Sequence, residues 1–124
     1  MVDLREPMRE LIQDPKTYTR DLEFPDPDKI FLYDDTLRDG EQMPGVAFSP
    51  QQKVELAELL SEIGVDVMDV AFPVSSESDR QALSLILQAR RSGQIVNTVE
   101  VLAMCRSVQG DIDAVLQVVD ASGV

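Results

Sequence analysis

The sequence contains no histidine, no tryptophan and only one cysteine, Cys105. A single cysteine excludes an internal disulfide, and the sequence therefore predicts a reducing, cytoplasmic setting. The lack of histidine leaves Cys105 without an imidazole that could activate it as a nucleophile. We expect Cys105 to be a small residue of the core.

Basic residues are also scarce. There are 11 Lys and Arg against 23 Asp and Glu, which gives a net charge of −12 at pH 7. Nucleic-acid binding needs clusters of Lys and Arg against the phosphates, so this composition argues against a nucleic-acid partner. No apolar run approaches the roughly 20 residues that cross a bilayer, so no membrane partner is expected either.

Prolines interrupt residues 1–28, with Pro15, Pro25 and Pro27 among acidic side chains. Proline removes a backbone donor and pushes its predecessor into extended geometry, so we expect an irregular N-terminal arm. Two interpretations stay open. The arm is either draped over the fold or a partner subunit, or it is disordered.

From Lys29 onward, short apolar segments alternate with segments of helical periodicity. The segments 30–33, 65–72 and 95–104 are expected to be strands, the first of them buried. Strands and helices that alternate with short connections predict a parallel sheet, either doubly wound or in a (β/α)8 barrel. No GxGxxG turn follows any expected strand, which argues against a dinucleotide-binding sheet.

Capping residues mark the expected helices. Ser49 and Gln52 form a capping box at the start of the first helix. The second helix begins at Ser76 or Ser78, and the third begins near Asp111. The apolar residues expected to face the sheet are Leu56, Leu59, Leu60 and Ile63 in the first helix, Leu83, Ile86, Leu87 and Ala89 in the second, and Ile112, Val115, Leu116 and Val119 in the third.

The segment 34–45, with the sequence DDTLRDGEQMPG, is the most informative feature of the chain. It follows the first expected strand and brings several charges together before the chain turns at glycines. Arg38 beside Asp39 at the mouth of a strand suits the binding of a divalent cation next to an anionic, carbonyl-bearing ligand. A salt bridge at a strand end is the structural alternative for this pair.

The run DTLRDGEQMPG resembles the signature of the metal-dependent enzymes that condense an acyl-CoA with a 2-oxo acid. This family includes 2-isopropylmalate, homocitrate and citramalate synthases. The likeness continues through residues 65–79 and from 99 onward, and covers residues 30–124. It implies an α/β fold, an incomplete (β/α)8 TIM barrel made of the first three βα units. The expected domains are the arm, 1–28, and a partial TIM-barrel catalytic domain, 29–124, truncated before a later metal-binding strand.

The resemblance also implies a function, a Claisen-type condensation of acetyl-CoA or another acyl-CoA with a 2-oxo acid. These two substrates would be the small-molecule partners, a divalent metal (Mg²⁺, Mn²⁺ or Zn²⁺) the cofactor, and a homodimer the full-length assembly. Carried over from the family, Asp39 is a metal ligand. Arg38 is the catalytic residue, which also binds substrate and stabilises the developing alkoxide, and Gln42 is a substrate-binding residue.

Asp69 lies near the end of the second expected strand, where relatives generally carry Glu. The resemblance makes it a substrate-binding residue, although its side chain is shorter by a methylene. The structural alternative is an inward-facing acid paired with Arg38. We expect Asp34 and Asp35 to lie on opposite sides of the strand and to serve as hydrogen-bond anchors.

The family completes its metal site with a His-x-His pair on a later strand, and this sequence has no histidine. One carboxylate alone is a weak divalent site. We therefore expect the chain to be the N-terminal part of a synthase and to be inactive alone. Two alternatives stay open: a non-catalytic oligomeric or interaction module, and a metal-dependent aldolase or lyase of the same barrel. The identity of the 2-oxo acid stays open as well.

Overall fold

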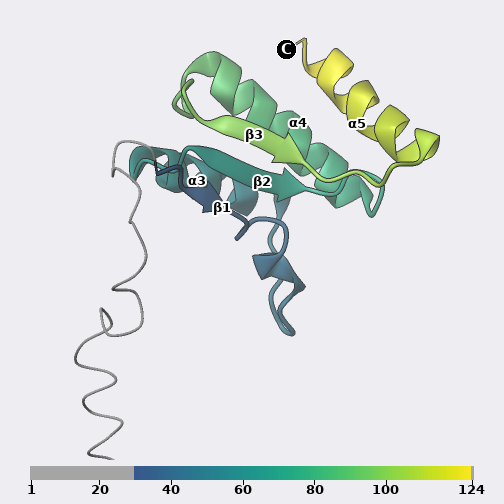
Figure 1. Cartoon of the computed structure of the whole chain (residues 1–124), viewed down its shortest axis with the longest axis horizontal. Coiled ribbons are helices and arrows are strands. Elements are labelled where there is room, and N and C mark those ends of the chain that lie inside the picture. The colour runs from purple at the N-terminus through teal and green to yellow at the C-terminus, as the bar shows by residue number, and fades with distance from the viewer. Residues whose placement is uncertain (1–29, 124) are drawn as a thin grey trace, which may run out of the picture. The chain divides into compact units, whose positions relative to one another are not determined.

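The computed structural model describes residues 30–123, so the expected arm, 1–28, lies outside the described residues. The elements follow the order β1 (Tyr33–Asp34), the 3-10 helix η2 (Gly40–Gln42), α3 (Pro50–Glu62), β2 (Val67–Ala71), α4 (Glu77–Ser92), β3 (Glu100–Ala103) and α5 (Gln109–Ser122) (Figure 1). This order confirms the alternation of strands and helices and the α/β class.

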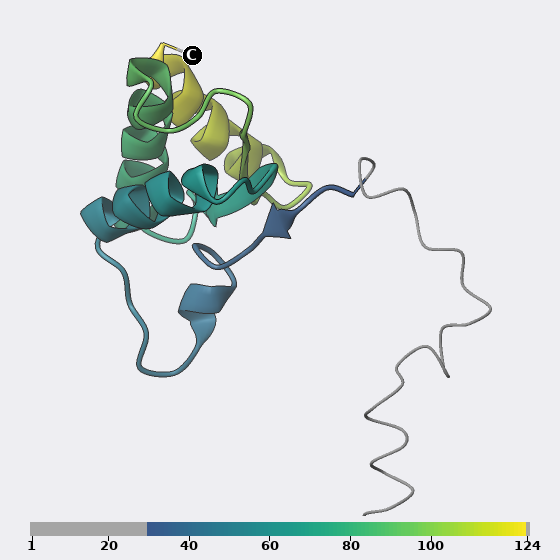
Figure 2. The same cartoon turned by 90° about the vertical axis from the view of Figure 1, so that its left-hand side faces the viewer.

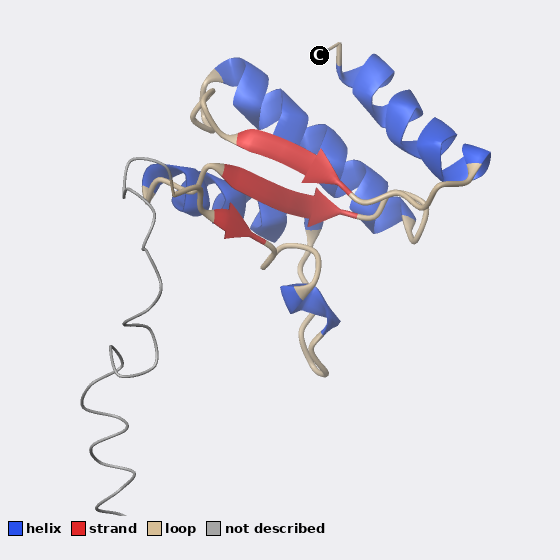
Figure 3. Ribbon diagram, viewed as in Figure 1, coloured by secondary structure: helices blue, strands red, loops and turns tan. Residues whose placement is uncertain are grey.

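The strands form one parallel sheet in the order β1-β2-β3. Tyr33 lies opposite Val67, and Val67 lies opposite Glu100. Since the strand arrows point in the same direction, the loops that follow the strands begin at one edge of the sheet (Figure 3). This carboxyl edge carries the segment 34–45, and βα folds generally place functional residues there.

Helix α4 occupies the centre of the helix layer, because it packs against α3, α5 and β2. The loop that carries η2 extends away from this layer (Figure 2). None of the helices within residues 30–123 is long and apolar enough to cross a bilayer.

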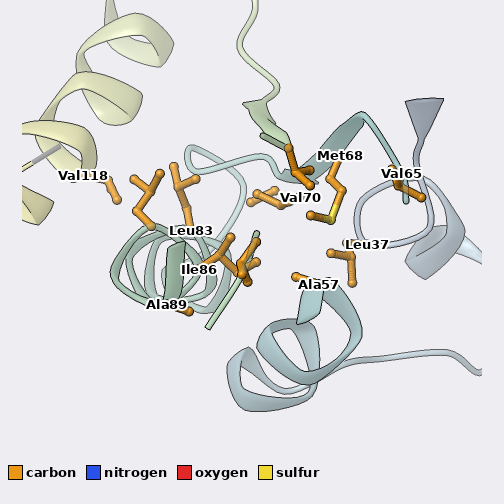
Figure 4. Packing of buried hydrophobic residues seen from close by; sticks show 13 residues of the cluster. Leu37, Ala57, Val65, Met68, Val70, Leu83, Ile86, Ala89 and Val118 are labelled. Atoms are coloured by element: carbon orange, nitrogen blue, oxygen red, sulfur yellow. The ribbon is translucent and has the colours of Figure 1, made fainter. Parts of the chain in front are cut away.

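The hydrophobic core lies between the sheet and the helices. Met68 and Val70 of β2 are fully buried there, with Ala57 of α3 and Ile86 of α4 (Figure 4). Leu37, from the segment 34–45 itself, is also 0% exposed and belongs to the same cluster. Burial of a leucine side chain contributes about 1.5–3 kcal/mol, so the core holds the chain directly beside Arg38 in place.

The expected helix ends are confirmed. The Oγ of Ser49 accepts a hydrogen bond from the Gln52 N–H at 3.2 Å, and the Gln52 Oε1 accepts one from the Ser49 N–H at 2.8 Å. Of the two candidates for the next cap, Ser76 is the N-cap of α4, and its Oγ accepts from the Asp79 N–H at 3.0 Å. Gly93 ends that helix in the left-handed conformation, with φ of +82°.

The first expected strand, 30–33, is wrong in its extent and in its burial. Strand β1 has only two residues, Tyr33–Asp34, and the Phe31 side chain is 77% exposed. Within residues 30–123, β1 pairs with β2 alone, so one of its edges has no neighbour to cover these side chains. A short apolar run predicts a buried strand only when neighbours lie on both sides of it.

The third expected strand, 95–104, is also too long, because β3 spans only Glu100–Ala103. The preceding residues form a turn at Asn97, in which the Val99 N–H donates to the Val96 carbonyl at 3.2 Å. Asparagine favours such turns, so the strand begins only after Asn97, although the apolar run starts earlier. The second expected strand, 65–72, contains β2 and is confirmed.

The expected buried face holds for α4 and holds only in part for its two neighbours, in which Leu56, Leu60 and Val119 are partly buried against the core. In α3, Leu59 and Ile63 are exposed, and in α5, Ile112 and Leu116 are exposed. The buried residues are instead Lys53, Ala57 and Ser61 in α3, and Asp111, Ala114, Val118 and Ser122 in α5. Both helices pack against α4 on one side, so the side nearest α4 is buried whether or not it is the more apolar one.

Candidate active site

A tight turn after β1 positions Arg38. The Asp35 carbonyl accepts hydrogen bonds from three successive N–H groups, those of Arg38, Asp39 and Gly40, at 3.3, 2.9 and 3.0 Å. The Asp34 carboxylate accepts from the backbone N–H of Thr36 at 3.0 Å and from its hydroxyl at 3.1 Å. Asp34 is therefore a local hydrogen-bond anchor, as expected, and the turn aims the Arg38 side chain at β2.

The Arg38 guanidinium lies among three carboxylates. Its Nε donates to the Asp69 Oδ2 at 2.6 Å, and its Nη2 donates to the Asp35 Oδ2 at 2.8 Å. A longer contact of 3.3 Å joins its Nη1 to the Asp39 Oδ1. The hydrogen bond to Asp69 raises the pKa of Arg38 above its ordinary value. The guanidinium is thus permanently charged and held in a fixed orientation.

Two carboxylate oxygens beside this guanidinium have no hydrogen-bond partner within the described residues. They are the Oδ1 atoms of Asp35 and Asp69, and both are buried. The other oxygen of Asp69 also accepts from the Tyr33 hydroxyl at 3.2 Å. An unsatisfied buried acceptor costs about 1–3 kcal/mol. These two oxygens are therefore suited to accept hydrogen bonds from a bound ligand.

The structure brings Arg38 and Asp69 together, so the pairing given above as the structural alternative for Asp69 is confirmed as a contact. A role of Asp69 in substrate binding stays a prediction. The Asp39 side chain is 61% exposed, and Gln42 is exposed on η2. Both residues lie on the loop after Arg38, where they are open to a ligand.

Asp39 can offer a hard carboxylate oxygen to a divalent cation. Within residues 30–123, however, no three His, Cys, Asp or Glu side chains form a group that could hold a metal ion. Asp39 therefore fits as a single ligand, and the described part of the chain does not make a complete metal centre.

Comparison with known proteins gives the family. A family profile described as HMGL-like matches residues 29–124. The chain belongs to the HMGL-like family. Since this is a TIM-barrel family, the HMGL-like chain is a partial (β/α)8 barrel, which confirms the fold and the family that the resemblance implied.

Three relatives illustrate the similarity of this HMGL-like chain to synthases. Homocitrate synthase AksA of Methanopyrus kandleri is 45% identical over 98 residues, which cover 79% of this chain and 23% of that protein. Putative (R)-citramalate synthase CimA of the same organism is 42% identical, over 73% of this chain and 17% of the relative. For 2-isopropylmalate synthase of Methanocaldococcus jannaschii the identity is 38%, over 73% and 16%. The chain thus spans 16–23% of the length of these relatives.

The expected core position of Cys105 is wrong. Cys105 is exposed, because it lies just beyond β3 in the loop that leads to α5. The next residue, Arg106, donates to both Asp111 carboxylate oxygens, at 2.7 and 3.0 Å, and lies 5.7 Å from the centre of the Phe72 ring. This end of β3 is therefore fixed by Arg106 rather than by the cysteine.

Sequence reasoning missed the buried lysine of this HMGL-like chain, Lys53. Its side chain is 2% exposed, and its Nζ lies 2.7 Å from the Glu41 carboxylate and 2.8 Å from the Asp79 carboxylate. A signal existed in the spacing, because Lys53, Ala57 and Ser61 recur every fourth residue and so share one helix face. The apolar residues of the same helix gave a stronger helical pattern, so they, and not Lys53, were predicted to be buried.

Proposed function

We propose that this HMGL-like chain is part of an acyltransferase that condenses acetyl-CoA, or another acyl-CoA, with a 2-oxo acid. The observation that carries the proposal is the Arg38 guanidinium, held by Asp69 and Asp35 at the carboxyl edge of the sheet. The names of the similar synthases support the reaction class. The substrate side chain and the pathway are left open by these observations.

In this proposal Arg38 is the catalytic residue. A base outside the described residues removes the α-proton of the acyl-CoA, and the resulting carbanion attacks the 2-oxo carbon. The ketone oxygen becomes an alkoxide, and a fixed guanidinium stabilises that charge as it develops. The alkoxide then takes up a proton, and water hydrolyses the thioester to release CoA. Asp69 and Asp35 orient the guanidinium, and their free oxygens accept hydrogen bonds from a water. Gln42 and Asp69 would contact the 2-oxo acid.

A divalent metal fits the proposal with Asp39 as one of its ligands. When bound, such a metal polarises the ketone and lowers the barrier to attack. The remaining ligands would come from residues other than those described here. A homodimer and a cytoplasmic location also stay predictions, because no observation on the described residues bears on either.

The first prediction concerns Arg38. In the gene product that contains this chain, the Arg38→Gln variant should lower kcat by roughly 100-fold or more, because transition-state charge loses its partner. Release of the CoA thiol from acetyl-CoA measures the rate, with 2-oxo acids that carry a methyl, a branched or a carboxylated side chain. Arg90→Gln is the matched control, since the Arg90 side chain on α4 donates, within residues 30–123, only to the Asn97 carbonyl, at 3.1 Å.

The same assay separates the alternatives. No CoA release with any 2-oxo acid would overturn the proposal, and cleavage of a hydroxy acid without CoA release would favour a lyase. The 124 residues alone should be inactive. A stable oligomer of the isolated chain, together with an inactive gene product, would favour the interaction-module alternative.

A further inference from the structure

Lys53 is the largest fully buried side chain of the described residues, although it carries a charge. An ammonium group is stable in such a place only when its donors are matched by acceptors. Its Nζ has three neighbours: Glu41 at 2.7 Å, Asp79 at 2.8 Å and the Val70 carbonyl at 3.4 Å. Asp79 and the Val70 carbonyl accept hydrogen bonds from the ammonium group, and Glu41 forms an ion pair with it, so oxygen atoms of the chain surround the buried charge.

The acceptors come from different parts of the carboxyl edge. Glu41 belongs to η2, between Asp39 and Gln42, and its carboxylate also accepts from the Phe48 N–H at 2.8 Å. The Glu41 side chain thereby joins η2 to the far end of the loop 38–48. Lys53 holds this loop to the first turns of α3.

Asp79 fixes the neighbouring loop in the same way. Its Oδ2 accepts from the Ser75 hydroxyl at 2.6 Å and from the Phe72 N–H at 3.3 Å, in the loop between β2 and α4. The other oxygen of Asp79 accepts from Lys53. The lysine therefore connects the loop that follows β1 with the loop that follows β2.

We propose that Lys53 is a positioning residue, which acts through Glu41 to hold the loop 38–48 in the geometry that Arg38 and Asp39 require. The inference rests on the proposed function of that loop. On the opposite face of β2, the Arg38–Asp69 contact joins the loop after β1 to strand β2 itself. A shift of about 1 Å at a catalytic group lowers the rate by roughly 100-fold, so this second connection matters for rate as well as for folding.

The test uses three variants in the gene product that contains this chain. Glu41→Gln removes the charge that holds the loop 38–48, Asp79→Asn removes the one that holds the loop after β2, and Lys53→Met removes both connections. Amide hydrogen exchange should rise about tenfold at Phe48 and in residues 42–46 for Glu41→Gln, and at Phe72 and Ser75 for Asp79→Asn. Lys53→Met should raise exchange at both places.

Kinetics provide the second measurement. Lys53→Met and Glu41→Gln should lower kcat by roughly 10- to 100-fold, with a smaller change in the KM for acyl-CoA. Ile86→Val is the control for simple destabilisation, because Ile86 is buried in the core and distant in sequence from both loops. This control should raise exchange throughout the core and leave kcat unchanged well below the unfolding temperature.

Each possible result supports or overturns the positioning role of Lys53. Exchange that is unchanged in the loop 38–48, or raised equally everywhere as in Ile86→Val, overturns the positioning role. Raised loop exchange with an unchanged kcat overturns it as well, since the loop geometry would then not limit the reaction. If the unaltered protein releases no CoA, the proposed function fails, and the exchange pattern still decides whether Lys53 holds the loop.

Discussion

Two cations of the described residues, the partly buried Arg38 and the buried Lys53, illustrate how polar contacts separate function from support. The Lys53 ammonium donates to Asp79 and to the Val70 carbonyl and forms an ion pair with Glu41, all within the chain. Beside Arg38, by contrast, the Oδ1 atoms of Asp35 and Asp69 have no hydrogen-bond partner within the described residues. Buried polar groups are usually satisfied, so the unsatisfied ones mark where a ligand is expected and the satisfied ones mark support.

Asp79 gives a prediction on pH at the scale of the residue. Burial by itself raises the pKa of Asp79, but hydrogen bonds from Lys53, Ser75 and the Phe72 N–H outweigh burial and hold the pKa below its ordinary value. A carboxyl group whose pKa is lower in the folded state stabilises the fold above its unfolded pKa of about 3.9. This stabilisation is lost as the pH falls through the folded pKa.

The Asp79→Asn variant of the gene product that contains this chain checks this sign. The variant should be less stable by about 1–3 kcal/mol at pH 7, because a charged hydrogen-bond acceptor is lost. Its free energy of unfolding in urea should fall less on acidification below pH ~4 than that of the unaltered protein. A variant that loses stability with acid as steeply as the unaltered protein would show that other carboxylates dominate.

Capping gives a prediction at the scale of the element. Ser76→Ala should destabilise the protein by about 1 kcal/mol, because the Asp79 N–H loses its acceptor at the start of α4. Ser78→Ala is the matched control in the first turn of the same helix, and should change the stability by less than about 0.5 kcal/mol. Urea unfolding at pH 7 of the gene product that contains this chain measures both. Equal effects would mean that the serine hydroxyls stabilise α4 in some way other than the cap.

The elements also show what a sequence can predict. Helix starts such as Ser49 and Ser76 were predicted correctly, because their hydrogen bonds form within a few residues of chain. The length of β1 and the buried face of α3 were not, since both depend on which neighbour lies beside them. In the candidate site, the Arg38–Asp69 pair was foreseen as an alternative because the family motif draws attention to both residues, whereas Lys53 was missed because the apolar residues of α3 gave the stronger helical pattern.

For the molecule as a whole, the open edges of the sheet matter most. Within residues 30–123, β1 and β3 each pair with β2 alone. Large apolar side chains are exposed near both, with Phe31 and Leu32 before β1 and Leu102 on β3. On the helix layer, Leu116 of α5 is exposed as well. Unpaired parallel edges and bare apolar faces favour association.

The last prediction follows from this surface. The isolated chain should self-associate with increasing concentration, or unfold without a sharp cooperative transition, in sedimentation velocity and urea unfolding. Leu116→Lys should weaken the association by roughly tenfold, since about 1–2 kcal/mol of apolar burial is lost. Gln117→Lys is the matched control on the same helix, because it adds the same charge without removing apolar surface. A monomer at every concentration with a sharp unfolding transition would contradict the prediction, and equal effects of the two variants would mean that charge, rather than the apolar face of α5, governs association.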